Sequence, residues 1–155
     1  MSENEEFDSI ASDLPTICSQ VLELGKQVLE IIVDTKAGLD EQGKMARTMG
    51  IKLFKKYAKM PIEDWIQYAK DLAPELEKLV KSIEKGDKEE INQVMVPISE
   101  AKLKLVDLKE NYISTAKMAS RFLKGEELED ALDGLSFSEN RIGLLIEAIE
   151  FLENN

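Results

Sequence analysis

Apolar residues recur at alternating spacings of three and four along two long stretches of the chain, and this period restricts its fold more than any other feature. The first stretch lies within residues 14–31 and the second within residues 98–122. The seam positions are Leu14, Ile17, Val21, Leu24, Val28 and Ile31 in the first, and Ile98, Ala101, Leu105, Leu108, Tyr112, Thr115, Ala119 and Phe122 in the second. In an α-helix such positions share one face, which is typical of the seam of a helical bundle or coiled coil.

The composition agrees with this pattern. Strong helix formers dominate the chain, and only 4 Pro and 8 Gly interrupt them. No run with the period of a β-strand exceeds a few residues. We therefore predict an all-α fold, an antiparallel helical bundle of four to six amphipathic helices with coiled-coil-like packing.

The 155 residues are enough to build one hydrophobic core. We predict that residues 1–12 form a mobile acidic leader, from which Phe7 and Ile10 could dock, and that residues 13–155 form a single helical-bundle domain. Asp13 and Pro15 mark the first helix start, because proline is favoured in a first turn and an acid complements the positive end of the helix dipole.

Residues 14–59 leave two interpretations open. The seam becomes polar and glycine-containing between Thr35 and Gly43, and then recovers. Either one long helix continues to about Lys59, or the first helix stops near residue 36 and a hairpin turn leads into a second helix. Gly38 as a C-terminal cap, followed by Asp40 in the next first turn, favours the hairpin.

A third helical segment is expected to begin at Pro61, which breaks any helix that precedes it. Its apolar stripe extends to Ile83, and Gly86 ends it. Pro74 lies inside this segment and removes one backbone donor, so we expect a kink or a split there.

Proline and glycine also divide the rest of the chain. Asp87 is expected to cap a short segment that stops before Pro97, and Pro97 to open the helix that Gly125 ends. A short acidic helix should then extend to Gly134. Ser138 is expected to cap the last helix.

One basic stretch stands out in an acidic chain. Residues 44–59 carry six cations and no acid, whereas the formal net charge of the whole chain is −11. These cations are Lys44, Arg47, Lys52, Lys55, Lys56 and Lys59. Met45, Met49, Leu53 and Tyr57 recur every four positions beside them, so we expect this apolar stripe in the core and the lysines on the opposite side.

Several roles fit this basic face. It is either a solvated face whose lysines pair with acids on neighbouring helices, or a docking face. The docked object could be an acidic protein partner, or this protein's own acidic C-terminal region in an oligomer. An anionic membrane surface is another candidate, because lysines flanking Met, Leu and Phe are typical of interfacial helices.

The C-terminal region is strongly acidic. Residues 125–155 carry nine acids against Arg141 alone. A cluster of five, Glu126, Glu127, Glu129, Asp130 and Asp133, lacks the oxygen spacing of a calcium loop, and a solvated acidic face is favoured over a metal site. The overall charge balance does not favour nucleic-acid binding, which needs a net basic face.

The residue inventory excludes several chemistries. The chain has no histidine and one cysteine, Cys18, which is expected to be a packed thiol. Catalytic triads with histidine, zinc fingers, iron–sulfur clusters and helical di-iron sites are therefore excluded. No phosphate-binding glycine motif is present. We expect no cofactor, no metal and no catalytic residue.

The function expected from these observations is a non-enzymatic interaction module, an adaptor, inhibitor or regulator that docks through a charged helix face. A membrane-surface or lipid-associated bundle that uses residues 44–59 is the alternative, and a small enzyme with carboxylate and lysine chemistry is third. The start of the sequence lacks the pattern of a secretory signal, so a cytoplasmic protein is expected, with signal-independent export left open.

Overall fold

The computed structural model describes residues 9–155, which form five α-helices and no strand. They are α1 (Leu14–Asp40), α2 (Lys44–Ala58), α3 (Ile62–Lys85), α4 (Lys88–Phe122) and α5 (Gly125–Glu153). The predicted all-α bundle is confirmed. Residues 1–8, most of the predicted acidic leader, lie outside the described part, whereas Ile10 and Ala11 are partly buried against the core.

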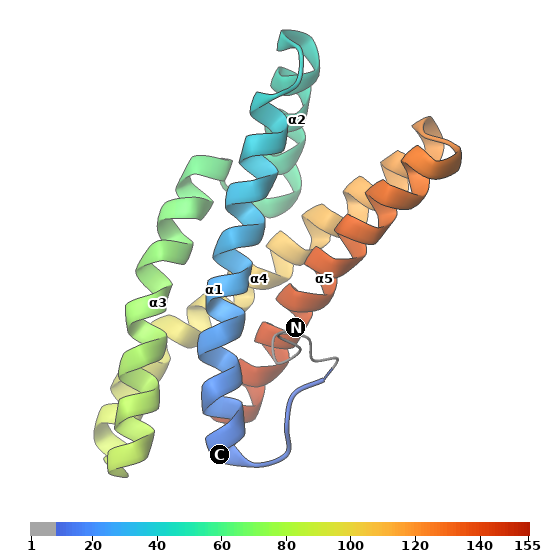
Figure 1. The fold of residues 1–155 in the computed structure, drawn as a ribbon. Helices are drawn as coiled ribbons and strands as arrows, with labels where there is room; N and C mark the ends of the chain where they lie inside the picture. Colours follow the sequence, from blue (N-terminus) through green and yellow to red (C-terminus); the bar gives the residue numbers. More distant parts are fainter. Residues whose placement is uncertain (1–8) are drawn as a thin grey trace.

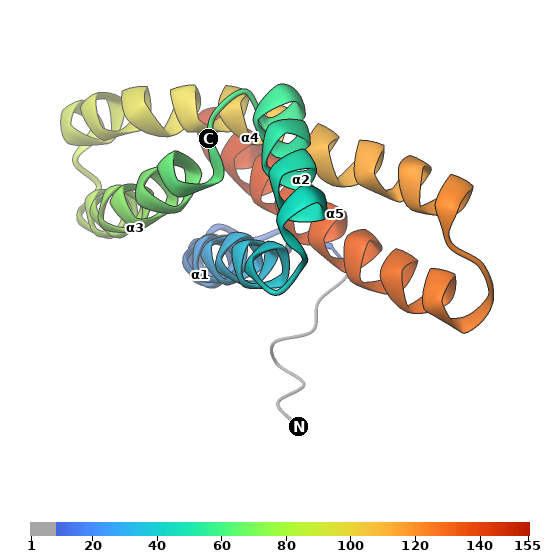
Figure 2. The ribbon, with the colours of Figure 1, turned by 90° about the horizontal axis from the view of Figure 1, so that it is seen from above.

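The four long helices alternate in direction between packed neighbours. Helices α1 and α4 ascend in Figure 1, and α3 and α5 descend beside them. The α4–α5 pair is tilted against α1 and α3, so the far end of the α4–α5 hairpin diverges from the α1–α2 hairpin. Seen from above in Figure 2, α2 lies over α4, and the tip of the α4–α5 hairpin extends away to one side.

The core is built from the predicted seams. Every α1 seam position from Ile17 to Ile31 is buried, and the α4 seam is buried from Ile98 to Tyr112. Beyond Tyr112 the prediction is wrong, because Thr115 is exposed and Phe122 is 76% exposed. The end of α4 extends past the other helices of the core and keeps mainly α5 as its neighbour (Figure 1).

The favoured hairpin is confirmed for residues 14–59, but its turn lies later than expected. Helix α1 continues to Asp40, with Gly38 inside it, and Gly43 is the N-cap of α2. Gly38 is therefore not a C-terminal cap. A Cβ added at Gly50 would lie 2.5 Å from Leu39 Cδ2, so the absence of a side chain there lets the two arms of the hairpin meet.

Two helix starts and one helix end follow the sequence signals. The Asp13 carboxylate accepts a hydrogen bond from the Thr16 amide at 3.1 Å, and Asp87 accepts one from the Glu90 amide at 3.1 Å. Gly86 ends α3 with φ of 72°, a left-handed conformation that glycine adopts without steric cost.

The split expected at Pro74 and the helix boundary expected at Pro97 do not occur, whereas a kink at Pro74 stays a prediction. Pro74 lies inside a continuous α3, and Pro97 lies inside a continuous α4, so the separate segment after Asp87 is part of α4. The buried Leu72 and Leu76 lie on either side of Pro74 and hold helix α3. Proline has no N–H to donate to the carbonyl of Lys70, and because Pro74 is exposed, this carbonyl can bind water instead.

The last two predicted helices are likewise one. Helix α5 passes through Gly134 without a break, and Ser138 Oγ donates to the Gly134 carbonyl at 3.1 Å instead of capping a new helix. A glycine inside a helix costs only about 1 kcal/mol. Packing along α4 is sufficient to offset that cost.

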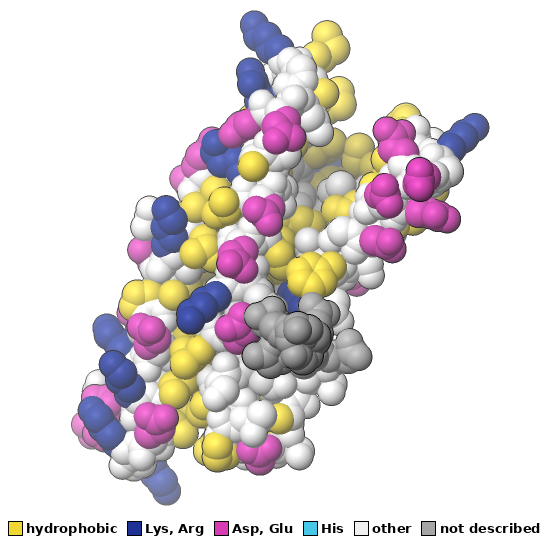
Figure 3. Space-filling view, in the orientation of Figure 1, with side chains coloured by type: hydrophobic (Ala, Val, Ile, Leu, Met, Phe, Trp, Pro, Cys, Tyr) yellow, Lys and Arg dark blue, Asp and Glu magenta, His cyan; other side chains and the backbone are white. Residues whose placement is uncertain are grey.

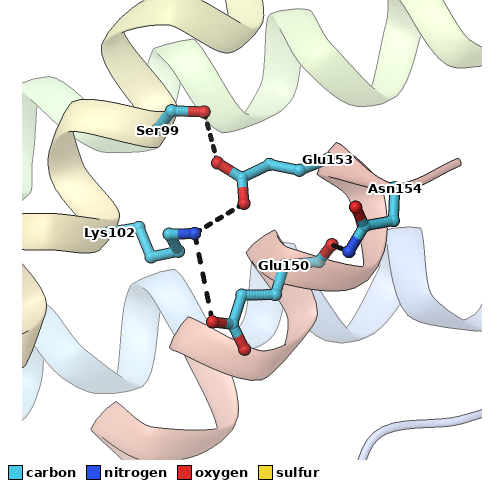
Figure 4. A network of polar contacts seen from close by, with 5 residues as sticks. All are labelled: Ser99, Lys102, Glu150, Glu153 and Asn154. Atoms are coloured by element: carbon cyan, nitrogen blue, oxygen red, sulfur yellow. Dashed lines mark hydrogen bonds and ion pairs between the residues drawn. The ribbon is translucent and has the colours of Figure 1, made fainter.

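A polar network joins the C-terminal end of α5 to α4 (Figure 4). The Glu153 carboxylate accepts hydrogen bonds from Lys102 Nζ at 2.7 Å and from Ser99 Oγ at 2.5 Å. Lys102 Nζ also lies 3.9 Å from a Glu150 oxygen. The bonds from Lys102 and then Ser99 hold the pKa of Glu153 below its ordinary value of 4.5.

This network predicts a pH-dependent contribution to stability. A carboxylate whose pKa is lowered by folding stabilises the fold above its unfolded pKa, and the contribution is lost as pH falls through the folded pKa. We expect Glu153→Gln to lower the melting temperature at pH 7, and the difference from wild type to vanish below the folded pKa, under pH 4.5. Thermal unfolding monitored by circular dichroism between pH 3 and 7 checks this. A difference that is constant with pH would contradict it.

Candidate docking surface

The basic face of α2 is uncovered. Lys44, Lys52, Lys55, Lys56 and Lys59 are exposed, and Arg47 is half-buried. Within residues 9–155, none of these six cations forms an ion pair with an acid. Lys56 Nζ lies 5.3 Å from the centre of the Tyr57 ring, a cation–π contact with its own neighbour. Acids of the described bundle therefore do not pair with these cations.

The methionines of α2 are exposed beside these cations, which corrects the predicted core stripe. Met45 is 82% exposed and Met49 is 58% exposed, whereas the residues that α2 buries are Phe54 and Ala58. A spacing of four residues advances by about 40° around a helix with 3.6 residues per turn. The stripe from Met45 to Tyr57 therefore drifts out of the core, and its first half shares the solvent face with the lysines.

The other side of α2 is fixed firmly to the bundle. The indole of Trp65 donates a hydrogen bond to the Ala58 carbonyl at 2.9 Å, which satisfies one of the free carbonyls at the end of α2. Lys59 then takes a left-handed conformation with φ of 70°, and its amide donates to the Lys55 carbonyl. The basic face is thus presented on a helix that is anchored at its C-terminal end.

An apolar cleft opens beside α2, where the two hairpins diverge. It has a volume of about 240 Å³ and is lined by Thr35 and Leu39 of α1, Gly50, Leu53 and Phe54 of α2, and Asn111, Thr115, Met118, Ala119 and Phe122 of α4. In Figure 3 the hollow between the hairpins shows hydrophobic surface. Small-molecule sites span roughly 300–1,000 Å³, so this cleft better fits one or two inserted side chains.

A hydrogen bond joins α1 and α4 beside the cleft. The hydroxyls of Thr35 and Tyr112 lie 2.7 Å apart, and the Thr35 hydroxyl also donates to the Ile31 carbonyl. Burial raises the pKa of Tyr112 to about 12, with the hydrogen bond to Thr35 acting against that rise. Tyr112 therefore stays neutral at physiological pH and serves as a structural tie between the two helices.

The cleft continues onto the exposed methionines. Leu53, which lines the cleft, follows Met49 by four residues, and Met49 follows Met45 by four, so consecutive members of this series are neighbours on the helix surface. Lys44, Met45, Thr48, Met49 and Lys52 together line a second, shallow hollow on the outer side of α2. Cations and apolar groups thus form one continuous surface at the tip of the α1–α2 hairpin.

The opposite hairpin carries charge of the other sign. Glu126, Glu127, Glu129, Asp130 and Asp133 of α5 are all exposed, and within residues 9–155 none of them forms an ion pair. Figure 3 shows acidic side chains gathered near the tip of the α4–α5 hairpin. No group of three His, Cys, Asp or Glu side chains in the described chain is arranged to hold a metal ion.

Another exposed apolar stripe lies on the outer face of α4. It consists of Val96, Leu103 and Val106, which are 62%, 68% and 51% exposed. The charged residues around it, such as Glu100, Lys104 and Asp107, are of mixed sign. The α2 surface, by contrast, combines exposed apolar side chains with cations and no acid. None of the helices in residues 9–155 combines the length and the apolar character needed to cross a bilayer.

The sequence identified the cations of this surface but not its apolar part. The apolar spacing places Met45, Met49 and Phe122 in core seams, whereas all three are exposed. The small or polar seam residues Thr115 and Ala119 were the available signal that the end of α4 leaves the core, since a buried seam usually carries large apolar groups there.

In comparisons with models of protein families, with curated proteins and with solved structures, the chain matched none of them.

Proposed function

We propose that this protein is a helical interaction module, an adaptor, inhibitor or regulator, that binds an acidic amphipathic protein segment. The docking surface is the tip of the α1–α2 hairpin, together with the apolar cleft beside it. The partner's acids would face the α2 cations, and its apolar side chains would cover the methionines and enter the cleft.

One observation carries this proposal: Met45 and Met49 are 82% and 58% exposed among cations that have no acid partner within residues 9–155. A solvated charged face does not need large apolar side chains in it. Contiguous exposed apolar surface beside charge is typical of a protein-binding site, and methionine adapts well to varied partners. Complementary charge would chiefly set the register and the association rate.

Charge reversal with a matched control tests the proposal. Lys44, Lys52, Lys55 and Lys56 are changed together to Glu, and the control carries Glu at four other exposed lysines, Lys26, Lys70, Lys81 and Lys88, which form no ion pair within residues 9–155. The two variants have the same net charge. Partners captured by cross-linking in the native source are identified by mass spectrometry and compared with those of wild type.

We expect the α2 variant to lose its acidic partners by about tenfold or more, and the control to keep them, while both keep wild-type helicity by circular dichroism. Equal loss of partners from both variants would show that binding depends on the net charge of the protein and not on α2. Retention by the α2 variant would show that α2 is not the docking surface.

A second candidate uses the same surface on an anionic membrane. The position of Met45 beside Lys44 and Lys52 favours it, because an interfacial helix places apolar groups in lipid and lysines at the headgroups. The acids of α5 at the same end of the molecule oppose it. Flotation with phosphatidylserine vesicles at low salt tests this candidate. Binding that is lost in the α2 variant would support it, and recovery of all protein in the unbound fraction would remove it.

A further inference from the structure

Two faces of opposite charge lie at the same end of this molecule, and neither is matched within the described chain. Residues 44–59, which are helix α2 and its C-cap, carry six cations, and residues 125–140 of α5 carry six acids and no base. Among residues 9–155, no ion pair involves any of these twelve side chains. The two hairpins that bear them diverge, and the apolar cleft lies between them (Figures 1 and 3).

On the basis of the docking role proposed above, we propose that the partner is a second copy of this chain. Two copies would pair about a two-fold axis, with the basic α2 of each against the acidic first half of the other's α5. Both copies would then contribute both faces, which is the self-complementary arrangement of a symmetric dimer. This is the partner for which the molecule itself supplies the complementary charge.

The proposed dimer interface would also contain exposed apolar side chains. Phe122 is exposed and lines the cleft, and Met45 and Met49 are exposed and line the second hollow on α2. Phe137 of α5 is 43% exposed on the acidic hairpin. Pairing would remove these side chains from water at the centre of the interface, with the charged residues around them. Such a centre with a polar rim is the usual anatomy of a protein interface.

The long-range repulsion between two acidic chains is a smaller effect than this local complementarity. At physiological ionic strength, charges separated by more than about 8 Å are largely screened, whereas directly opposed faces are closer than that. The dimer should consequently weaken as salt is raised, because the attraction between exposed faces is itself screened at about 1 M salt.

Sedimentation velocity of the full chain tests the proposal with four proteins: wild type, two charge reversals and a control. Wild type is expected to dimerise at low salt. Reversal of Lys44, Lys52, Lys55 and Lys56 to Glu should weaken the dimer by about 100-fold, and so should reversal of Glu126, Glu127, Glu129 and Asp130 to Lys. The control with Glu at Lys26, Lys70, Lys81 and Lys88 should dimerise like wild type.

Mixing the two reversed variants gives the sharpest result. The acidic α2 of one variant can meet the basic α5 of the other, and the unchanged α5 of the first can meet the unchanged α2 of the second, so a heterodimer should form. Non-specific attraction does not explain such a heterodimer, because both variants remain net negative on a starting charge of −11. Two reversed variants that stay monomeric when mixed would overturn the proposal.

The outcomes also separate this proposal from the one it rests on. If wild type is monomeric at low salt but the α2 reversal still loses captured partners, the docking surface stands and the second copy is refuted. If the dimer forms but the α2 reversal leaves it intact, the pairing of α2 with α5 is refuted. If neither capture nor dimerisation depends on α2, both proposals fail.

Discussion

Replacing Trp65 by alanine is expected to lower the free energy of unfolding by about 3–5 kcal/mol, the usual cost of truncating a buried aromatic side chain. Trp65 is 1% exposed and stands near the start of α3. Its ring meets Tyr68 edge-on, with centres 5.4 Å apart. Chemical denaturation of the variant measures the loss, and a loss below about 1 kcal/mol would contradict the described packing.

The hydrogen bond of Trp65 gives this prediction a second part. Because the indole binds the Ala58 carbonyl, the alanine variant should also release the C-terminal end of α2. Relative to wild type, we expect the variant to speed up hydrogen exchange at the amides of α2 more than at those of α4. Trp65→Phe keeps most of the packing but removes the hydrogen bond and part of the buried ring, so it should cost less than alanine, about 1–2 kcal/mol.

Replacing Gly25 by valine is the second change with a large expected effect. A Cβ at this position in α1 would lie 2.7 Å from Leu76 Cδ1 of α3, and Leu76 is itself 1% exposed. Valine therefore forces α1 and α3 apart or pushes Leu76 into filled space. Overpacking of this kind typically costs about 1–3 kcal/mol.

Gly38 provides the matched control in the same helix. It lies inside α1, and an added Cβ would meet nothing within 4 Å. Gly38→Ala should therefore stabilise the protein by about 0.5–1 kcal/mol, because alanine loses less backbone freedom in a helix. Denaturant titration compares the two variants. Unchanged stability of Gly25→Val would contradict the close approach at Gly25, and destabilisation by Gly38→Ala would contradict the open helical position of Gly38.

The seams were predictable because one period, repeated over many residues, is a strong signal. From Ile17 to Ile31 and from Ile98 to Tyr112, apolar spacing alone identified the core. Helix breaks were less predictable. A proline inside a helix costs about 3 kcal/mol and a glycine about 1 kcal/mol relative to alanine. At Pro74, Pro97 and Gly134 tertiary packing on both sides offsets this cost, and a local sequence signal does not contain that packing.

The docking surface was only half predictable for a related reason. The cations of α2 are visible in the sequence as a run of one sign. Exposure of Met45, Met49 and Phe122 depends on where each helix extends beyond its neighbours, and that follows from the tilt of α4 and α5 against α1 (Figure 1). Such a tilt is a property of the assembled bundle.

Zero-length carbodiimide cross-linking of wild type tests the central proposal most directly. Copies labelled with ¹⁴N and ¹⁵N are mixed, so that mass spectrometry separates cross-links between copies from those within one chain. We predict mixed-isotope links that join Lys52 and Lys55 of one copy to Glu126 and Glu129 of the other, and their loss in the α2 reversal. Links between copies that bypass α2, or links within single chains only, would contradict the proposed pairing.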